Sequence, residues 1–335
     1  MKYIQTVTIL DVGHGNAGVI QGADDALVVD CGPGSSLLEY LTEAEVAEVS
    51  EVLISHADQD HIRGLVALLA ARAVKVGTVR VNSDAQKASK LWTSLLWELD
   101  RVEREGGTKL ELSLTEGMVF EVQPNIKLTV LAPRKALAGT GPGAKDERGR
   151  SIEGNTISAV IQVSSGDNPV VLFTGDLDSL GLEHMLDAGH KPIVPVLVFP
   201  HHGGKAGDSI STDQNQEFAK RLCEATSPQM VIFSIGRERS ENPRREIVEG
   251  IRQVAPEARI ACTQLSTRCA QELPADKPSH LLPIYARGRE RGRCCAGSLT
   301  LSLAADPPWL PDREAHHRYI SNSVPEALCR FQLGG

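Results

Sequence analysis

Short apolar runs separated by polar turns dominate the first part of the chain. The runs at residues 6–10, 26–29 and 51–54 are rich in Val, Ile and Leu, which favours buried β-strands. The segments at 35–47 and 62–73 instead place apolar residues three and four positions apart, which predicts amphipathic helices. Strands and helices therefore alternate from the start of the sequence.

The same alternation continues to the last third of the chain. Further strands are predicted at 78–81, 119–122, 126–131, 156–163, 169–174, 193–199, 230–235, 258–261 and 298–303, and further helices at 84–105, 177–188, 215–224 and 244–254. The segment 133–153 is rich in Gly, Pro, Lys and Arg and predicts a long flexible loop. This order is typical of a layered α/β protein.

Three of the predicted strands stop at groups of histidine and aspartate. The groups are His56-Ala57-Asp58-Gln59-Asp60-His61, Gly175-Asp176 and His201-His202-Gly203. Ligands delivered by several strand ends converge at one edge of a sheet, where loops stay open to substrate. Isolated Asp and His residues in loops are ordinarily solvated turn residues, but the number gathered in these three loops argues against that interpretation.

The spacing within the first group points to metal binding by a compact loop. Four potential ligands lie within six residues, whereas the helical zinc motif of proteases spaces them by a helical turn. A compact loop can direct His56 and Asp58 one way and Asp60 and His61 the other, which suits two neighbouring ions. Imidazole and carboxylate together suit Zn²⁺, Mn²⁺ or iron, and the carboxylates favour harder ions such as Mn²⁺.

Composition limits the class of protein without naming it. The 335 residues carry a net charge of −8, which argues against an extended nucleic-acid-binding surface but not against a local basic groove. No window approaches the length of apolar sequence that a membrane span needs. The N-terminal sequence lacks the features of a secretory signal, so we expect a cytoplasmic protein whose seven cysteines are thiols or metal ligands.

The motifs resemble those of the metallo-β-lactamase fold, and within it the C-terminal hydrolase domain of the bacterial DNA-uptake channel ComEC. The matching segments are LDVGHGNA at 10–17, VDCG at 29–32, SHADQDHIRGL at 55–65, NTIS at 155–158, LFTGDL at 172–177 and PHHGG at 200–204. The resemblance implies a four-layer αββα sandwich. We expect it to occupy residues 1–305, with a Cys- and Arg-rich segment at 262–296 and a polar tail at 306–335.

The same resemblance implies a two-metal site with Zn or Mn. It assigns His56 and Asp58 to one ion, Asp60, His61 and one of His201 and His202 to the other, and Asp176 as a bridge between them. The residues alone leave the choice between the two adjacent histidines open. Asp58, Asp60 and His202 are the candidate catalytic residues, and Asp11 is a further carboxylate expected to face the ions.

Two positions depart from the pattern of these relatives. Asn155 stands where many of them have another histidine ligand, so the first ion is expected to have few ligands. Asn242 replaces a histidine that often follows the next strand, and Lys205 is a candidate to supply positive charge to the substrate instead.

The Cys- and Arg-rich segment allows two interpretations for each residue type. Cys262, Cys269, Cys294 and Cys295, with His280 nearby, are candidates for one further structural zinc site, although free cysteines are commonly small buried hydrophobes. The alternating Arg287, Arg289, Arg291 and Arg293 form either a solvated loop or a contact to phosphate groups.

Three functions fit the sequence. The first is a dinuclear metal-dependent hydrolase, preferably a phosphodiesterase or nuclease that acts on nucleic acid or a nucleotide through a metal-activated water. The second is hydrolysis of a carbonyl substrate such as a lactone or thioester on the same fold. The third is a catalytically silent interaction or sensor subunit beside a partner protein from the same bacterial system, which the absence of bound metal would favour.

Overall fold

Two seven-stranded sheets form the centre of the protein, whose computed structural model describes residues 5–22, 25–123, 125–207, 209–237, 241–303 and 312–330. In spatial order, the first sheet contains β14 (Leu299–Ser302), β1 (Thr6–Ile9), β2 (Gly18–Gln21), β3 (Ala26–Val29), β4 (Glu48–Ile54), β5 (Lys75–Val81) and β6 (Lys109–Glu111). The second contains β13 (Arg259–Cys262), β12 (Met230–Phe233), β11 (Val196–Val198), β10 (Asn168–Phe173), β9 (Val160–Ser165), β8 (Ile126–Ala132) and β7 (Val119–Gln123).

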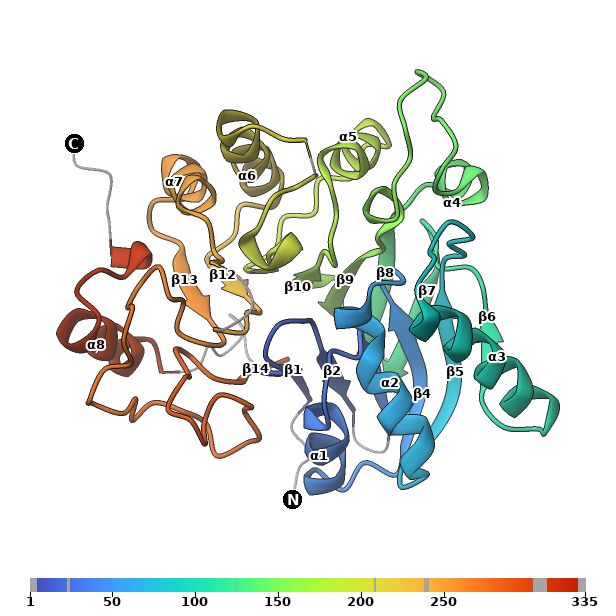
Figure 1. The fold of residues 1–335 in the computed structure, drawn as a ribbon, viewed down its shortest axis with the longest axis horizontal. Helices are drawn as coiled ribbons and strands as arrows, with labels where there is room; N and C mark the ends of the chain where they lie inside the picture. The colour runs from blue at the N-terminus through green and yellow to red at the C-terminus, as the bar shows by residue number, and fades with distance from the viewer. Residues whose placement is uncertain are drawn as a thin grey trace.

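Helices cover the outer face of each sheet (Figure 1). The first sheet is covered by α1 (Ser36–Glu43), α2 (Gln59–Ala71) and α3 (Lys90–Arg104), and the second by α5 (Ser179–Asp187), α6 (Thr212–Thr226) and α7 (Arg245–Val254). The remaining helices are α4 (Lys135–Thr140), α8 (Arg313–Ser323) and the short 3₁₀ helices η1 (Asn155–Ile157), η2 (Pro200–Gly203) and η3 (Leu328–Arg330). Among the described residues, no helix is long and apolar enough to cross a membrane.

Three apolar layers hold the sandwich together. Between the sheets, side chains such as Ile9 and Leu53 of the first sheet meet Ile161 and Phe173 of the second. Separate clusters fill the space between each sheet and its own helices. Successive side chains of a strand point to opposite faces of its sheet, and both faces of these sheets pack against apolar cores. For this reason β3 is apolar at every position. The predicted αββα sandwich is therefore confirmed.

Parallel pairing brings the candidate site residues to one edge of each sheet. In the first sheet β3, β4, β5 and β6 run parallel, and in the second β10, β11, β12 and β13 run parallel. The carboxyl ends of parallel strands lie at the same edge, and the polar loops follow at these ends. The backbone N–H of Ala159 donates to the Ser55 carbonyl across the two sheets, so the two edges meet at this point.

The expectation of a flexible loop at 133–153 is wrong. The segment begins with α4, and several of its charged residues form ion pairs. The Asp146 carboxylate is almost completely buried and accepts hydrogen bonds from Arg150 and from His184 of α5. His184 lies more than 30 residues further along the chain than Asp146, so local composition could not reveal this contact.

Two other boundaries also differ from the prediction. Helix α3 begins at Lys90 rather than at residue 84, because the Ser89 side chain caps it by accepting from the Trp92 backbone N–H. The polar tail expected from residue 306 contains α8, whose Tyr319 and Ile320 join the apolar cluster beneath α6 and α7. A helix that buries so few apolar residues leaves only a weak periodic signal in the sequence.

Candidate metal centre

Three loops at the adjoining sheet edges bring the predicted ligands together. Asp60 and His61 lie in the first turn of α2, after β4, while Asp176 follows β10 and His202 follows β11. One ligand atom from each of these four residues lies within 4.8 Å of all the others. In the part of the chain that the structure describes, this is the group of His, Cys, Asp and Glu side chains arranged to hold a metal ion.

Two of these histidines are fixed so that the same ring nitrogen faces the group. Nδ1 of His61 donates to Asp30 at 2.8 Å, and Nδ1 of His202 donates to the Ser234 carbonyl at 2.8 Å. Nε2 of His61 then lies 3.3 Å from one oxygen of Asp176, and Nε2 of His202 lies 3.2 Å from Asp60. An outer hydrogen bond of this kind sets the tautomer of metal-binding histidines.

His56 faces the other oxygen of the central carboxylate. Its Nδ1 is 3.1 Å from the hydroxyl of Ser55, which in turn donates to Asp30. Its Nε2 is buried without a hydrogen-bond partner, 3.9 Å from Oδ2 of Asp176 and 3.8 Å from Asp58. An unpaired buried nitrogen between two carboxylates is suited to bind a metal cation.

The adjacent histidines of η2 point to different sides of Asp176. The His202 ring lies toward Asp60, whereas Nδ1 of His201 is 3.7 Å from Oδ2 of Asp176, on the side of His56. Both residues have left-handed backbone conformations, with φ of 51° and 54°. That conformation costs roughly 1–3 kcal/mol for each non-glycine residue and is typical of functional sites, where it directs side chains that an ordinary turn would not.

Burial and charge shift His56 and Asp176 toward the forms that bind a metal. Burial and the neighbouring His61 hold the pKa of His56 well below 6.5, so its ring is neutral. Burial alone would raise the pKa of Asp176, but the positive charges of His61, His202 and His201 outweigh it and hold that pKa well below 3.8. A neutral imidazole and an ionised carboxylate are the ligand forms of these residues. Against the effect of burial, the neighbouring carboxylates instead raise the pKa of His61 and of His202, so these two rings would release a proton when a cation binds.

Sequence reasoning missed two side chains beside the group. Nε2 of His14 is 3.7 Å from Asp60, and its ring centroid is 4.4 Å from that of His202. The Gly-His-Gly turn directly after β1 was the available signal for this residue. Lys87 forms an ion pair with Asp58, but it lies in the turn before α3, where nothing in the sequence distinguishes it.

The other expected site residues occupy varied places around the centre. The Asn242 amide donates to the backbone carbonyl of His201 at 3.2 Å and thereby supports the η2 turn. Asn155 begins η1 and is half-buried, and Lys205 is exposed three residues beyond His202.

Asp11 and the cysteines lie outside the group formed by Asp60, His61, Asp176 and His202. Asp11 is fully buried and accepts hydrogen bonds from the Gly13 and Gly288 backbones, away from the ligand group. The thiol of Cys294 lies against Asp11, while that of the adjacent Cys295 lies 3.4 Å from His316. Adjacent residues point to opposite sides of their strand-like segment, so Cys294 lies apart from the other three cysteines of the expected zinc site. Cys262, Cys269 and Cys295 line one small cavity together with Cys329, and the zinc site stays a prediction.

Comparison with known proteins places this geometry in a family. The family model described as "Metallo-beta-lactamase superfamily" matches residues 10–221. ComE operon protein 3 of Bacillus subtilis (strain 168) is 23% identical over 214 residues, which cover 64% of this chain and 23% of that protein. The match thus spans less than a quarter of the length of that protein.

Solved structures give further similarities at low identity. The metallo-beta-lactamase fold protein YhfI from Bacillus subtilis is 15% identical with a TM-score of 0.47, covering 77% of this chain and 96% of that one. Zn(2+)-bound PqqB from Methylobacterium extorquens is 10% identical with a TM-score of 0.47, covering 77% and 97%. On the extent of the family match, the chain belongs to the metallo-beta-lactamase superfamily of metal-dependent hydrolases.

Proposed function

We propose that this protein is a dinuclear metal-dependent phosphodiesterase that acts on nucleic acid or a nucleotide. The observation that carries the proposal is the position of Asp176. One of its oxygens faces His61 and His202, and the other faces His56 and His201. A buried carboxylate with imidazole nitrogens on both sides is the arrangement expected of a bridge between two cations.

The two positions differ in how complete their ligand sets are. For one ion we assign Asp60, His61, His202 and Asp176, which already lie within ligand distance of one another. For the other we assign His56, Asp58 and the second oxygen of Asp176, with His201 nearest to complete it. Lys87 holds Asp58 in an ion pair, so this second position is expected to bind its ion more weakly.

Divalent ions held here would lower the pKa of a bound water toward neutrality and offset negative charge on the attacked group. The protein itself supplies orientation and proton transfer. Asp58 is one-third exposed at the mouth of the centre, where it can accept a proton from an approaching water. Lys87 and His14 lie at the same mouth, and both can donate hydrogen bonds to substrate oxygens.

A phosphodiester is preferred to a carbonyl substrate because Lys87 and His14 at the mouth can both donate hydrogen bonds to the charged oxygens of a phosphate. Burial and the charge of His202 lower the pKa of His14 to about 4, so His14 is a neutral donor. Burial lowers the pKa of Lys87, which forms an ion pair with Asp58. The ComEC-like motifs and the match to ComE operon protein 3 support the same preference.

An assay of metal content and substrate range tests the proposal. Purified protein should be analysed for Zn and Mn and then assayed with each ion on single- and double-stranded DNA, RNA, bis-p-nitrophenyl phosphate and a lactone. We expect hydrolysis of the phosphodiesters, loss of activity on chelation, and no activity in Asp60→Ala or in the double variant Asp58→Ala/His61→Ala. Asp167→Ala is the matched control, because Asp167 is a fully exposed carboxylate in the turn before β10.

Two results would contradict the proposal. Activity on the lactone alone would indicate the carbonyl hydrolase. Protein that retains no metal, with Asp60→Ala indistinguishable from the control, would indicate the catalytically silent subunit.

A further inference from the structure

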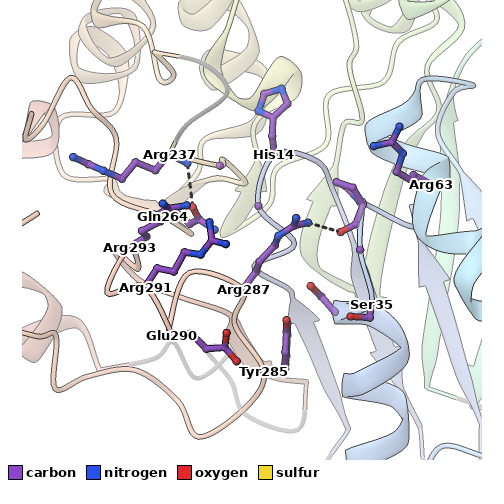
Figure 2. Close-up of a pocket in the computed structure, with 15 residues that line it drawn as sticks. His14, Ser35, Arg63, Arg237, Gln264, Tyr285, Arg287, Glu290, Arg291 and Arg293 are labelled. Atoms are coloured by element: carbon purple, nitrogen blue, oxygen red, sulfur yellow. Dashed lines mark hydrogen bonds between the residues drawn. The ribbon is translucent and has the colours of Figure 1, made fainter. Parts of the chain in front are cut away.

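A cleft rich in arginine lies beside the metal centre. It has a volume of about 560 Å³. Five arginines line it: Arg63, Arg237, Arg287, Arg291 and Arg293 (Figure 2). Among the described residues that line it, Glu290 is the one carboxylate. This concentration of positive charge contrasts with the net charge of −8 of the whole chain, so general composition does not explain it.

His14 connects the cleft with the candidate metal centre. This residue lines the cleft, and its Nε2 is 3.7 Å from Asp60. Figure 2 shows Arg63 on α2 at one wall, Arg291 and Arg293 at the opposite wall, and Arg287 between them. A substrate held at the metal centre that extends past His14 would meet these arginine side chains.

Several of the arginines have no protein carboxylate to neutralise them. Among the described residues, Arg63, Arg287 and Arg291 form no ion pair. Arg63 donates to the neutral side chain of Gln59, and Arg287 donates to the backbone carbonyls of Val12 and Pro33. Guanidinium groups left uncompensated around one cleft favour an anionic ligand, and their planar fork matches phosphate oxygens.

The surrounding backbone is shaped around these side chains. Asp11 joins both sides of the cleft, because its carboxylate accepts from the N–H groups of Gly13 and Gly288 and from the amide of Gln264. A Cβ atom at Gly34 would lie 2.9 Å from a nitrogen of Arg287, and the residue has a φ of +94° that favours glycine. The position of Arg287 thus depends on the loop of Gly34 as well as on its own loop, and the two are far apart in sequence.

The structure also separates the alternating arginines of the sequence. Arg287, Arg291 and Arg293 line the cleft. Arg289 does not, and its guanidinium donates to the backbone carbonyls of Leu282 and Ile284. The segment 287–293 is therefore neither a wholly solvated loop nor a continuous phosphate-binding strip.

We propose that this arginine cleft binds a phosphate group of the substrate other than the one attacked at the metal centre. The inference rests on the proposed phosphodiesterase function and narrows its substrate class. The substrate would carry at least two phosphates, as an oligonucleotide does along its backbone and as a nucleotide does in a polyphosphate chain. A phosphodiester with a single phosphate would not reach the arginines.

The test compares substrates with one and with several phosphates in the double variant Arg63→Gln/Arg291→Gln. We expect KM for a single-stranded oligonucleotide to rise roughly tenfold with kcat nearly unchanged, because the lost contacts bind ground state and transition state alike. The slope of log KM against log salt should fall by about 1.4 for two lost phosphate contacts on a single strand. Hydrolysis of bis-p-nitrophenyl phosphate should not change.

A control and a second measurement keep the result interpretable. The control Arg104→Gln/Arg318→Gln removes the same number of positive charges, at exposed positions on α3 and α8. A nucleoside triphosphate used as competitor distinguishes the two sources of phosphate: strong inhibition that the double variant abolishes indicates a polyphosphate chain, and weak inhibition indicates an oligonucleotide backbone. Equal losses on the oligonucleotide and on bis-p-nitrophenyl phosphate, or no change on either, would overturn the proposal.

Failure of the proposed function can be told apart from failure of this inference. Binding of a fluorescent oligonucleotide and of inorganic triphosphate is measured by competition in the presence of chelator, where no hydrolysis occurs. If the wild type hydrolyses no phosphodiester but binds these probes, and the double variant does not, the cleft is confirmed while the phosphodiesterase is not. If neither probe binds the wild type, the cleft does not bind phosphate.

Discussion

At the scale of single residues, one carboxylate positions two of the metal-facing histidines. Asp30 accepts directly from Nδ1 of His61, and it accepts from the Ser55 hydroxyl that contacts Nδ1 of His56. It also accepts from the Ser55 backbone N–H at 2.7 Å. The residue reaches this position at the end of β3 with a left-handed backbone, at a φ of 61°.

We predict that Asp30→Asn lowers the affinity of the protein for Zn²⁺ or Mn²⁺ by about 10- to 100-fold, as loss of an outer-sphere partner commonly does. Asparagine tolerates the left-handed backbone and keeps the shape of the side chain, but it removes the charge and one acceptor that hold the two rings. Competition against a chromophoric chelator measures the affinity, with the exposed Asp167→Asn as control. An affinity equal to that of the control would show that Asp30 does not position the ligands.

The sequence indicated several side chains that gather at the sheet edges, but not the residues that surround them. His56, Asp58, Asp60 and His61 follow a strand at a spacing that few other chemistries need. By contrast, His14 and Lys87 approach the group only through the folded arrangement of distant loops. The choice between His201 and His202 depends on backbone conformations that residue types alone do not specify.

At the scale of elements, the first turn of α2 is held against the turn after β3. The Gly64 backbone N–H donates to the Cys31 carbonyl, and the Cys31 N–H donates to the carbonyl of His61. A Cβ at Gly64 would lie 2.2 Å from the carbonyl oxygen of Gly32, which real structures do not allow. The close approach of this helix therefore requires glycine, and it sets where Asp60 and His61 lie.

We predict that Gly64→Ala lowers the free energy of unfolding by about 1–3 kcal/mol and also weakens metal binding. The added methyl group must push the helix away from backbone that cannot rotate aside, and both ligands in its first turn move with it. Denaturant unfolding and chelator competition give the two quantities. Gly139→Ala, in α4 with nothing within 4 Å of the new Cβ, is the control and should leave metal affinity unchanged.

Elements with strong periodicity were predictable, and elements fixed by distant partners were not. The apolar runs of β10 and β11 appear in the sequence because both of their faces are buried. Helix α4 and the ordered segment after it were missed, since Asp146 and Arg150 find their partners on α5. Composition identified the charges of that segment correctly but could not show that they neutralise one another.

At the scale of the whole molecule, the last strand in the described part of the chain pairs with the first strand. β14 pairs antiparallel with β1, so residues near 300 complete the first sheet after the second has been built. Ligands come from both halves of the chain, with Asp60 from the first sheet and Asp176 and His202 from the second. A site of this kind forms only when both sheets are packed together, so we expect metal binding and folding to be coupled.

The final segment is part of this packing even though its sequence is largely polar. Ile320 of α8 is 4% exposed and lies in the cluster beneath α6 and α7, beside Cys262 of β13. We predict that Ile320→Ala lowers the free energy of unfolding by about 2–5 kcal/mol, the range found for buried Ile to Ala substitutions. Arg318→Ala, two residues earlier on the exposed face, should change it by no more than about 0.5 kcal/mol. Thermal and urea unfolding of both variants measure the difference, and metal content should match the wild type in each because α8 lies away from the ligand loops. Equal stability of the two variants would mean that the segment is an appendage, and the protein would then end structurally at β14.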